Sequence, residues 1–340
     1  MKKVLVLLGD PRLSDPVKNQ GKFNAEDLEV IDVLKKALSL LSNYEFEYFD
    51  EHAKLKEKLA NFNYDYVLNF CDEGLFNNAE LESEIPKMLD ELKIKYTGAS
   101  VKCLTECFNK IRVKEKARGI GIPTSKDVLV PNGHPVNVNF CFPAFVKPNY
   151  GDGSFGIDRN SLVKNESELK LQVQNIKLKL SEAGRKDDVL VEEFLEGYEI
   201  SAAVIGNEIR LIQEKFPKNI NFNLHETKWN PESKYWNETV SIKPEISFNV
   251  QNKIKEYSLK LFKEMGCRDY ARFDFRLDSN NEPRLLEVNP NCGWCWDGHL
   301  TKAFLIDKYE PETFVKYNEK ILVDYVIVLE KILKTAERRF

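Results

Sequence analysis

The sequence predicts an α/β protein that begins with a parallel sheet and continues as an α+β structure. Two observations support this. The first hundred residues alternate short apolar segments with a segment of helical periodicity. From residue 142 onward, strand-like segments flank a glycine-rich loop and later form a hairpin pattern. A chain of 340 residues is long enough for two or three domains with a substantial core.

The N-terminal region shows a strand–helix rhythm. Residues 26–41 place Leu28, Ile31, Leu34 and Leu38 at helical spacing. This alternation is typical of parallel βαβ units. The expected strands are 3–8 (KVLVLL), 46–49 and 65–70, and a second helix is expected at 79–92.

Two loops follow the ends of these expected strands, at residues 9–15 and 71–74. Ligands of parallel sheets bind beyond the carboxyl ends of the strands, so both loops are candidate binding loops. A polar loop at such a position can also simply turn the chain.

The remainder alternates helices and strands less regularly. The Gly/Pro segment 119–123 closes a helical stretch, and residues 214–243 are polar, aromatic and poorly periodic, which predicts a long loop. A helix-rich stretch is expected at 101–118 and single helices at 166–180, 247–265 and 311–337. The expected strands are 188–194 and 199–205, besides the strand before the glycine loop.

Composition excludes several classes of protein. With 42% hydrophobic and 31% charged residues the chain is an ordinary globular protein, and a net charge of −4 gives no reason to expect nucleic acid as a partner. The N-terminal apolar run, about six residues, is too short for a signal peptide, and no run approaches the ~18 residues of a membrane span. Seven cysteines without an export signal predict reduced thiols and a cytoplasmic location.

Residues 270–289 carry the most informative pattern. They alternate like two strands joined by the turn DSNNEP, so Arg272 and Asp274 share one face, as do Glu287 and Asn289. An Asp, a Glu and an Asn suit a hard cation such as Mg²⁺, and a neighbouring Arg suits charge on phosphate or on an oxyanion. A solvated hairpin face is the alternative. The apolar residues between them favour a functional site, because they predict that the opposite face is a core.

Two further segments could bind a nucleotide. Lys147 ends an apolar strand just before GDGSFG, where glycines let backbone N–H groups approach a phosphate. The segment lacks the ending of a P-loop and the spacing of a dinucleotide fingerprint, and it could be a plain hairpin tip. In VEEFLEGYEIS, Glu199 could accept ribose hydroxyls beside a backbone edge for a purine, or could simply be solvated.

The sequence CGWC (292–295) resembles a redox pair or half of a zinc site. The segment NPNCGWCWDGH does not start a convincing helix, and the nearest further ligands, Cys267 and His299, fit no familiar zinc spacing. We therefore interpret Cys292 and Cys295 as two loop thiols.

Taken in order, these segments resemble the ATP-grasp superfamily, and within it the D-alanine–D-alanine ligases. The likeness covers nearly the whole chain, including YTGAS (96–100) and the Asn109–Lys110 pair. It implies an ATP-grasp fold with an N-terminal Rossmann-like domain (1–103), a central subdomain (104–187) and a C-terminal subdomain (188–340). It also implies ATP and two Mg²⁺ ions (or Mn²⁺), amino-acid-like substrates, and a homodimer, because these ligases are commonly dimers.

The resemblance assigns a role to individual residues. Lys110 and Lys147 would contact the phosphates, and Lys228 would reach the γ-phosphate. Arg272 and the amide of Gly293 would stabilise the oxyanion. The remaining assignments are the phosphate loop Gly151, Gly153, Ser154 and Gly156, the adenine-framing Glu192, Phe194 and Leu195, the ribose-binding Glu199, and the metal ligands Asp274, Glu287 and Asn289.

The substrate-reading positions depart from the ligase pattern. The usual SAEREVS is here GDPRLSDPVKNQ, the usual HG is CDEG, and the usual Ser–Leu pair falls near Gly298 and His299, with Trp294 and Trp296 as bulky neighbours. We therefore expect a product other than D-alanyl-D-alanine. Candidates for reading other substrates, with plain surface charge as the alternative, are Arg12, Asp15, Asp72, Glu73 and Gly298.

Three functions are compatible with these residues. An ATP-dependent carboxylate–amine ligase that works through an acyl phosphate is the leading prediction. An ATP-grasp phosphotransferase that stops at a phosphorylated carboxylate or hydroxyl is the alternative. A regulatory nucleotide-binding protein is disfavoured, because every expected phosphate and metal residue is present.

Overall fold

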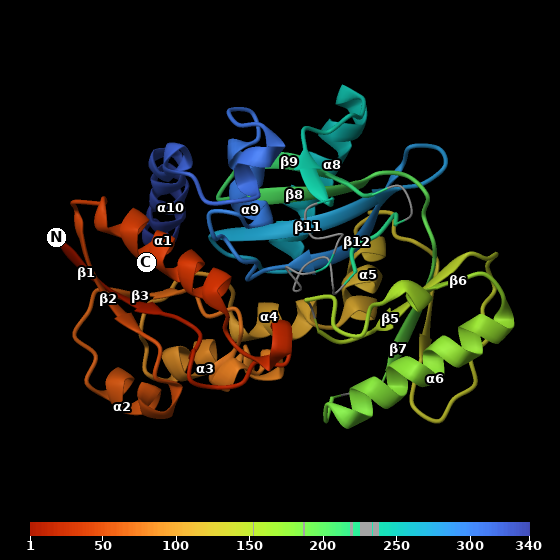
Figure 1. Ribbon diagram of the computed structural model, residues 1–340, viewed down its shortest axis with the longest axis horizontal. Coiled ribbons are helices and arrows are strands. Elements are labelled where there is room, and N and C mark those ends of the chain that lie inside the picture. The colour runs from red at the N-terminus through yellow and green to blue at the C-terminus, as the bar shows by residue number, and fades with distance from the viewer. Residues whose placement is uncertain (152, 186–187, 218–219, 225–232, 234–237) are drawn as a thin grey trace.

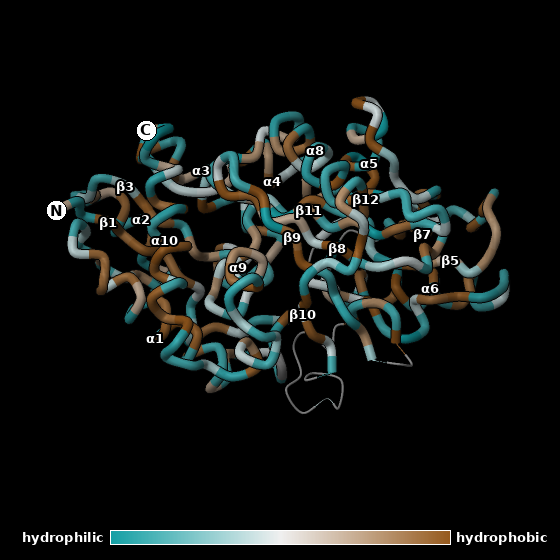
Figure 2. The backbone as a smooth tube through the Cα atoms, turned by 90° about the horizontal axis from the view of Figure 1, so that it is seen from above, coloured by the Kyte–Doolittle hydropathy of each residue, from teal (hydrophilic) through white to brown (hydrophobic). Residues whose placement is uncertain are grey.

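The computed structural model describes the chain except residues 152, 186–187, 218–219, 225–232 and 234–237. The described residues form three sheets, each with its own helices (Figure 1). Figure 2 shows the N-terminal sheet at one end, α6 at the other, and the C-terminal sheet between them. No helix in the described ranges is both long and apolar enough to cross a bilayer.

The N-terminal sheet is parallel, in the order β2-β1-β3, which confirms the predicted parallel architecture. Its central strand is apolar on both faces, because helices cover both. Asn24 caps α1 by accepting the amides of Glu26 and Asp27. The elements are β1 (Lys2–Leu7), α1 (Ala25–Ser39), β2 (Tyr44–Phe49), α2 (Leu55–Ala60), β3 (Tyr66–Asn69) and α3 (Glu84–Glu91).

A central antiparallel sheet, in the order β4-β7-β5-β6, follows in sequence. Apolar residues of α6 pack on one of its faces and form a separate core. The elements are α4 (Val101–Cys107), α5 (Lys110–Gly119), β4 (Asp127–Val130), β5 (Ala144–Pro148), β6 (Leu162–Val163), α6 (Glu166–Glu182) and β7 (Val189–Glu193).

The third sheet is antiparallel, in the order β10-β9-β8-β11-β12. One face packs on α4, α5 and α8, and part of the other packs on α9 and α10, which also contacts α1 of the N-terminal region. The elements are β8 (Glu199–Ile205), β9 (Glu208–Lys215), β10 (Val240–Ile242), α8 (Phe248–Glu264), β11 (Tyr270–Leu277), β12 (Pro283–Asn289), α9 (His299–Leu305) and α10 (Leu322–Glu337).

The element predictions hold in part. The helix-rich stretch expected at 101–118 is confirmed as the two helices α4 and α5, and the side chain of Asn109 accepts the amide of Arg112 where α5 starts. The helix expected at 311–337 begins only at Leu322, after two short 3-10 turns. β4, β9 and β10 were not expected, and β10 lies inside the predicted loop 214–243. The helix α9, which starts at His299 soon after CGWC, was not expected either. The division at residues 103 and 187 stays a prediction.

Candidate functional site

The β11–β12 hairpin forms one wall of the site. Arg272 lies opposite Asn289, and Asp274 lies opposite Glu287. The buried Phe273 lies between Arg272 and Asp274 on β11, and the buried Val288 lies between Glu287 and Asn289 on β12. The four polar side chains therefore point away from the core, to the other face of the sheet. The hairpin predicted from the sequence is confirmed, and it brings the guanidinium and the predicted oxygen donors together.

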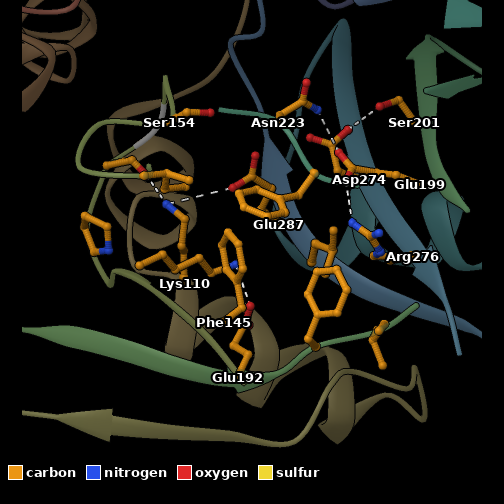
Figure 3. A pocket seen from close by; sticks show the side chains of 18 of the residues that line it. Lys110, Phe145, Ser154, Glu192, Glu199, Ser201, Asn223, Asp274, Arg276 and Glu287 are labelled. Atoms are coloured by element: carbon orange, nitrogen blue, oxygen red, sulfur yellow. Dashed lines mark hydrogen bonds and ion pairs between the residues drawn. The ribbon is translucent and has the colours of Figure 1, made fainter. Parts of the chain in front are cut away.

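Asp274 is the centre of a polar network (Figure 3). It accepts two hydrogen bonds from Arg272 Nε, at 2.9 and 3.1 Å, and one from Arg272 Nη2 at 2.9 Å. Ser201 Oγ donates to it at 2.7 Å, and Asn289 Nδ2 at 2.9 Å. These donors hold the Asp274 carboxylate in one orientation within a largely buried setting.

A buried ion-pair chain contributes Glu192 and Lys147 to the opposite wall. Lys114 Nζ lies 2.5 Å from one oxygen of Glu192, and Lys147 Nζ lies 2.7 Å from the other. Burial alone would raise the pKa of Glu192, but the two ammonium groups outweigh it and hold the pKa at about 2. Burial would also lower the pKa of Lys147, yet the Glu192 carboxylate raises it above its ordinary value. Lys147 is therefore a permanent cation at the pocket wall.

The glycine loop lies between these walls. Gly151, Gly153 and Gly156 adopt positive φ, and so does Ser154 at 60°. Such a backbone turns successive N–H groups toward one side, as phosphate-binding loops do. Lys110 donates to the carbonyl of Gly151, and its ammonium lies 3.9 Å from Glu287.

A pocket of about 930 Å³ opens between the central and C-terminal sheets. Part of its lining is apolar, and the rest includes Lys147 and the carboxylates Asp274 and Glu287, the last two of which Figure 3 shows. An apolar surface together with paired cations and carboxylates fits a purine followed by phosphates. The apolar part is lined by Phe145, Phe194, Leu195, Phe222 and Leu286, with Glu199 and Arg276 near them.

A second pocket, of about 1820 Å³, adjoins the first. The two pockets share part of their lining, which includes Arg272, Glu287, Lys110 and His299. A ligand in one pocket could therefore transfer a group to a ligand in the other at this shared wall. The rest of the second pocket comes largely from the segment after β12 and from Asp72.

The predicted substrate residues divide into two sets. Asp72 and Gly298 line the second pocket, together with Gly293. Asp15 and Glu73 instead surround the buried ammonium of Lys18, which lies 3.4 Å from Glu73. Lys18 thus explains why two carboxylates lie here, and neither Asp15 nor Glu73 lines either pocket.

Two further expectations at this end need correction. Arg12 pairs with Asp10 and Asp50 at 2.7 and 2.8 Å and does not line either pocket. Trp294 and Trp296, the bulky neighbours of the substrate-reading positions, do not line either pocket, because both are buried in the core with α9 and α10. Trp294 packs edge-on against Phe70, with ring centroids 4.4 Å apart.

The CGWC cysteines are free thiols that line the second pocket. Burial raises the pKa of both, that of Cys292 to about 12, so they are neutral near pH 7. Cys267, once considered as a further zinc ligand, instead contacts Cys103 at 3.8 Å between sulfurs.

Several site residues carried no recognisable signal in the sequence. Lys114 completes the Glu192 ion pairs from α5, which no local pattern indicates. Arg276 is the exception, because it is two residues after Asp274 and so falls on the same face of β11. His299 lies 3.4 Å from the buried Glu214, a contact between distant segments. Lys228, the predicted γ-phosphate contact, lies outside the described residues.

The residues present fit Mg²⁺. Within the described ranges, no group of three or more His, Cys, Asp or Glu side chains could hold a metal ion by itself. Asp274 and Glu287 provide two carboxylates, with the amide of Asn289 beside them. Mg²⁺ is commonly bound by one or two carboxylates plus the phosphates of a nucleotide and water, so this sparse oxygen set suits it.

A pocket between two antiparallel sheets, with a glycine loop and paired lysines at one wall and a carboxylate hairpin at the other, defines an ATP-grasp enzyme. Comparison with known proteins agrees. Residues 130–304 match the family model "D-ala D-ala ligase C-terminus". The chain belongs to the D-alanine–D-alanine ligase family and is an ATP-dependent ligase that forms an amide or peptide bond.

Individual relatives are distant. The uncharacterized protein y4sG of Sinorhizobium fredii is 31% identical over 61% of this chain and 60% of its own length. A D-alanine–D-alanine ligase of Haemophilus ducreyi is 28% identical over 74% of this chain and 78% of its own. The crystal structure of D-alanine–D-alanine ligase from Bacillus anthracis complexed with ATP has a TM-score of 0.69, at 19% identity over the full length of both chains.

Proposed function

We propose that the protein joins a carboxylate to an amine through an acyl phosphate, using two amino-acid-like substrates. One observation carries this proposal. The Arg272 guanidinium and the Glu287 carboxylate form part of a wall common to the nucleotide pocket and the second pocket. A phosphoryl group and its acceptor carboxylate would meet at that wall.

The reaction has two steps. The substrate carboxylate attacks the γ-phosphorus of ATP and gives an acyl phosphate and ADP. The second substrate's neutral amine then attacks the acyl carbon, and the tetrahedral oxyanion collapses to an amide as phosphate leaves and the nitrogen loses a proton. Arg272 and the amide of Gly293 would stabilise the oxyanion, and the protein otherwise acts by positioning.

The roles of the nucleotide residues follow from their positions. Lys147, held by Glu192, and Lys110 would contact the phosphates, with the glycine-loop amides around them. Phe194 and Leu195 would frame the adenine. Asp274, Glu287 and Asn289 would hold two Mg²⁺ ions, or Mn²⁺, which when bound neutralise phosphate charge and polarise the phosphoryl oxygens.

The second pocket supports substrates other than two D-alanines. Asp72 and Gly298 line it where the resemblance expects different residues, and Asp297 and Lys302 add charges there. We infer amino-acid-like substrates with polar or charged side groups. The seven free cysteines support a cytoplasmic enzyme, and the family suggests a homodimer, which light scattering would test.

The experiment is an ADP-release screen with Mg²⁺-ATP over amino acids and simple amines, singly and in pairs, followed by mass spectrometry of hits. A ligase requires a carboxylate and an amine together and yields an amide. Turnover with a single acceptor and a stable phosphorylated product would support the phosphotransferase instead.

A further inference from the structure

The nucleotide pocket contains a buried arginine that the roles above do not use. Arg276 lies on β11 two positions after Asp274 and is 5% exposed, and it lines the pocket. A guanidinium removed from water needs an acceptor for each N–H group, or its burial is costly.

The partners of Arg276 leave one of its three nitrogens without an acceptor. Nη1 donates to Glu199 at 3.3 Å, and Nη2 donates to the carbonyl of Asn221 at 2.5 Å. The guanidinium carbon lies 4.6 Å from the centre of the Phe194 ring. The buried Nε has no hydrogen-bond partner among the described residues. A buried donor left over at a pocket wall indicates an acceptor on a ligand.

Arg276 also orients its neighbour. Asn223 Nδ2 donates to Oε1 of Glu199 at 3.0 Å, so each carboxylate oxygen of Glu199 already has one donor (Figure 3). Arg276 and Asn223 thus hold the carboxylate from opposite oxygens, and a carboxylate, with about four acceptor positions, is suited to accept sugar hydroxyls as well. The positive charge of Arg276 offsets the negative charge of Glu199 next to a polyanionic ligand.

We propose that Arg276 is a specificity-determining residue for the ribonucleotide: it holds Glu199 against the sugar hydroxyls and donates its Nε–H to an acceptor atom of the nucleoside. This inference rests on the proposed ATP site and goes beyond it, because it assigns sugar discrimination to an arginine. A neutral side chain of similar length would fill the space of Arg276, but it would neither hold Glu199 nor donate to the nucleoside.

The test is calorimetric binding of ATP and of 2′-deoxy-ATP, with Mg²⁺ and without amino-acid substrates, to the full chain. Arg276→Met should raise the Kd for ATP about tenfold and reduce the preference for ATP over 2′-deoxy-ATP at least threefold. The matched control is Arg284→Met on the same hairpin, which removes an arginine paired with Asp278 at 2.7 Å outside the pocket. It should leave both values within twofold.

A Kd for ATP that changes less than threefold in folded Arg276→Met would overturn the inference, and so would an unchanged sugar preference. If that variant does not fold, Arg276→Gln, which is also neutral but keeps a polar end, is judged by the same limits. Wild-type protein that binds no Mg²⁺-ATP would refute the proposed function itself. Wild-type binding with an unaffected variant would refute only the role of Arg276.

Discussion

Asp274 and Glu287 are direct cross-strand neighbours in the β11–β12 hairpin, and both line the nucleotide pocket. Glu287 also lines the second pocket, so the paired carboxylates stand where the nucleotide pocket ends and the substrate pocket begins. This relationship makes the hairpin the place where phosphate charge would be neutralised.

Removing either charge should abolish turnover. Asp274→Asn and Glu287→Gln should each lower kcat by roughly 100-fold or more, because a single electrostatic contact to a transition state is often worth that much. ADP release measures it. Asp278→Asn, in the turn of the same hairpin, is the matched control and should retain wild-type kcat, since Asp278 binds Arg284 away from the pockets. Wild-type turnover in Asp274→Asn would refute the metal assignment.

The two lysines that share Glu192 should differ in effect. Lys147 lines the nucleotide pocket and Lys114 does not, although both touch Glu192. Lys147→Met should raise the KM for ATP at least tenfold. Lys114→Met should chiefly lower the free energy of unfolding, by about 3 kcal/mol, because it leaves a buried charge poorly paired. Kinetics and urea denaturation separate the two, and equal KM effects would contradict the division.

Acid should unfold the protein partly through Glu192. Its pKa is about 2 in the folded protein against 4.5 as the ordinary value, so its stabilisation is complete above pH 4.5 and is lost as pH falls toward 2. Between pH 4.5 and pH 2, Glu192 binds a proton in the unfolded chain but not in the folded protein, so acid favours unfolding. The difference corresponds to roughly 3 kcal/mol. Denaturant curves across this range should show a shallower pH slope for Glu192→Gln, and an unchanged slope would contradict the pairing.

The glycine loop should tolerate no side chain at Gly153. Its φ is +63°, and a Cβ there would lie 3.2 Å from a methyl group of Val17. Gly184→Ala is the matched control, with φ of +66° and open space around it. Both variants should lose about 1 kcal/mol of stability from backbone strain. Only Gly153→Ala should also lower kcat/KM for ATP, by about tenfold, and equal kinetics in the two variants would argue against a phosphate role.

Asp72 should affect substrates but not the nucleotide. It lines the second pocket, whereas Glu73 faces Lys18. Asp72→Asn should raise the KM of one amino-acid substrate at least tenfold and leave the KM for ATP within twofold. Asp50→Asn, which removes a carboxylate paired with Arg12 outside both pockets, serves as the control. An unchanged profile of accepted substrates would remove Asp72 from the site.

Local periodicity predicted the parts of this site that lie along one strand or loop. Arg272, Asp274 and the glycine loop were recognisable because residues two apart share a face and glycines permit positive φ. The parallel N-terminal sheet followed from strand–helix alternation in the same way.

Contacts between distant segments were not predictable. Lys114 reaches Glu192 across 78 positions (192 − 114), and Lys18 neutralises Glu73 from another loop. Trp294 and Trp296 looked like pocket residues because they follow the metal ligands, but burial against α9 and α10 decided their place. Tertiary packing, which no local pattern encodes, selects which polar groups face a pocket.

The most direct test of the acyl-phosphate mechanism follows oxygen. The carboxylate substrate identified by the ADP-release screen is labelled with ¹⁸O in both carboxylate oxygens and turned over with Mg²⁺-ATP and the amine. The mechanism transfers one labelled oxygen to the phosphate that leaves, so the released phosphate should carry one ¹⁸O and the amide the other. Unlabelled phosphate would contradict an acyl-phosphate ligase.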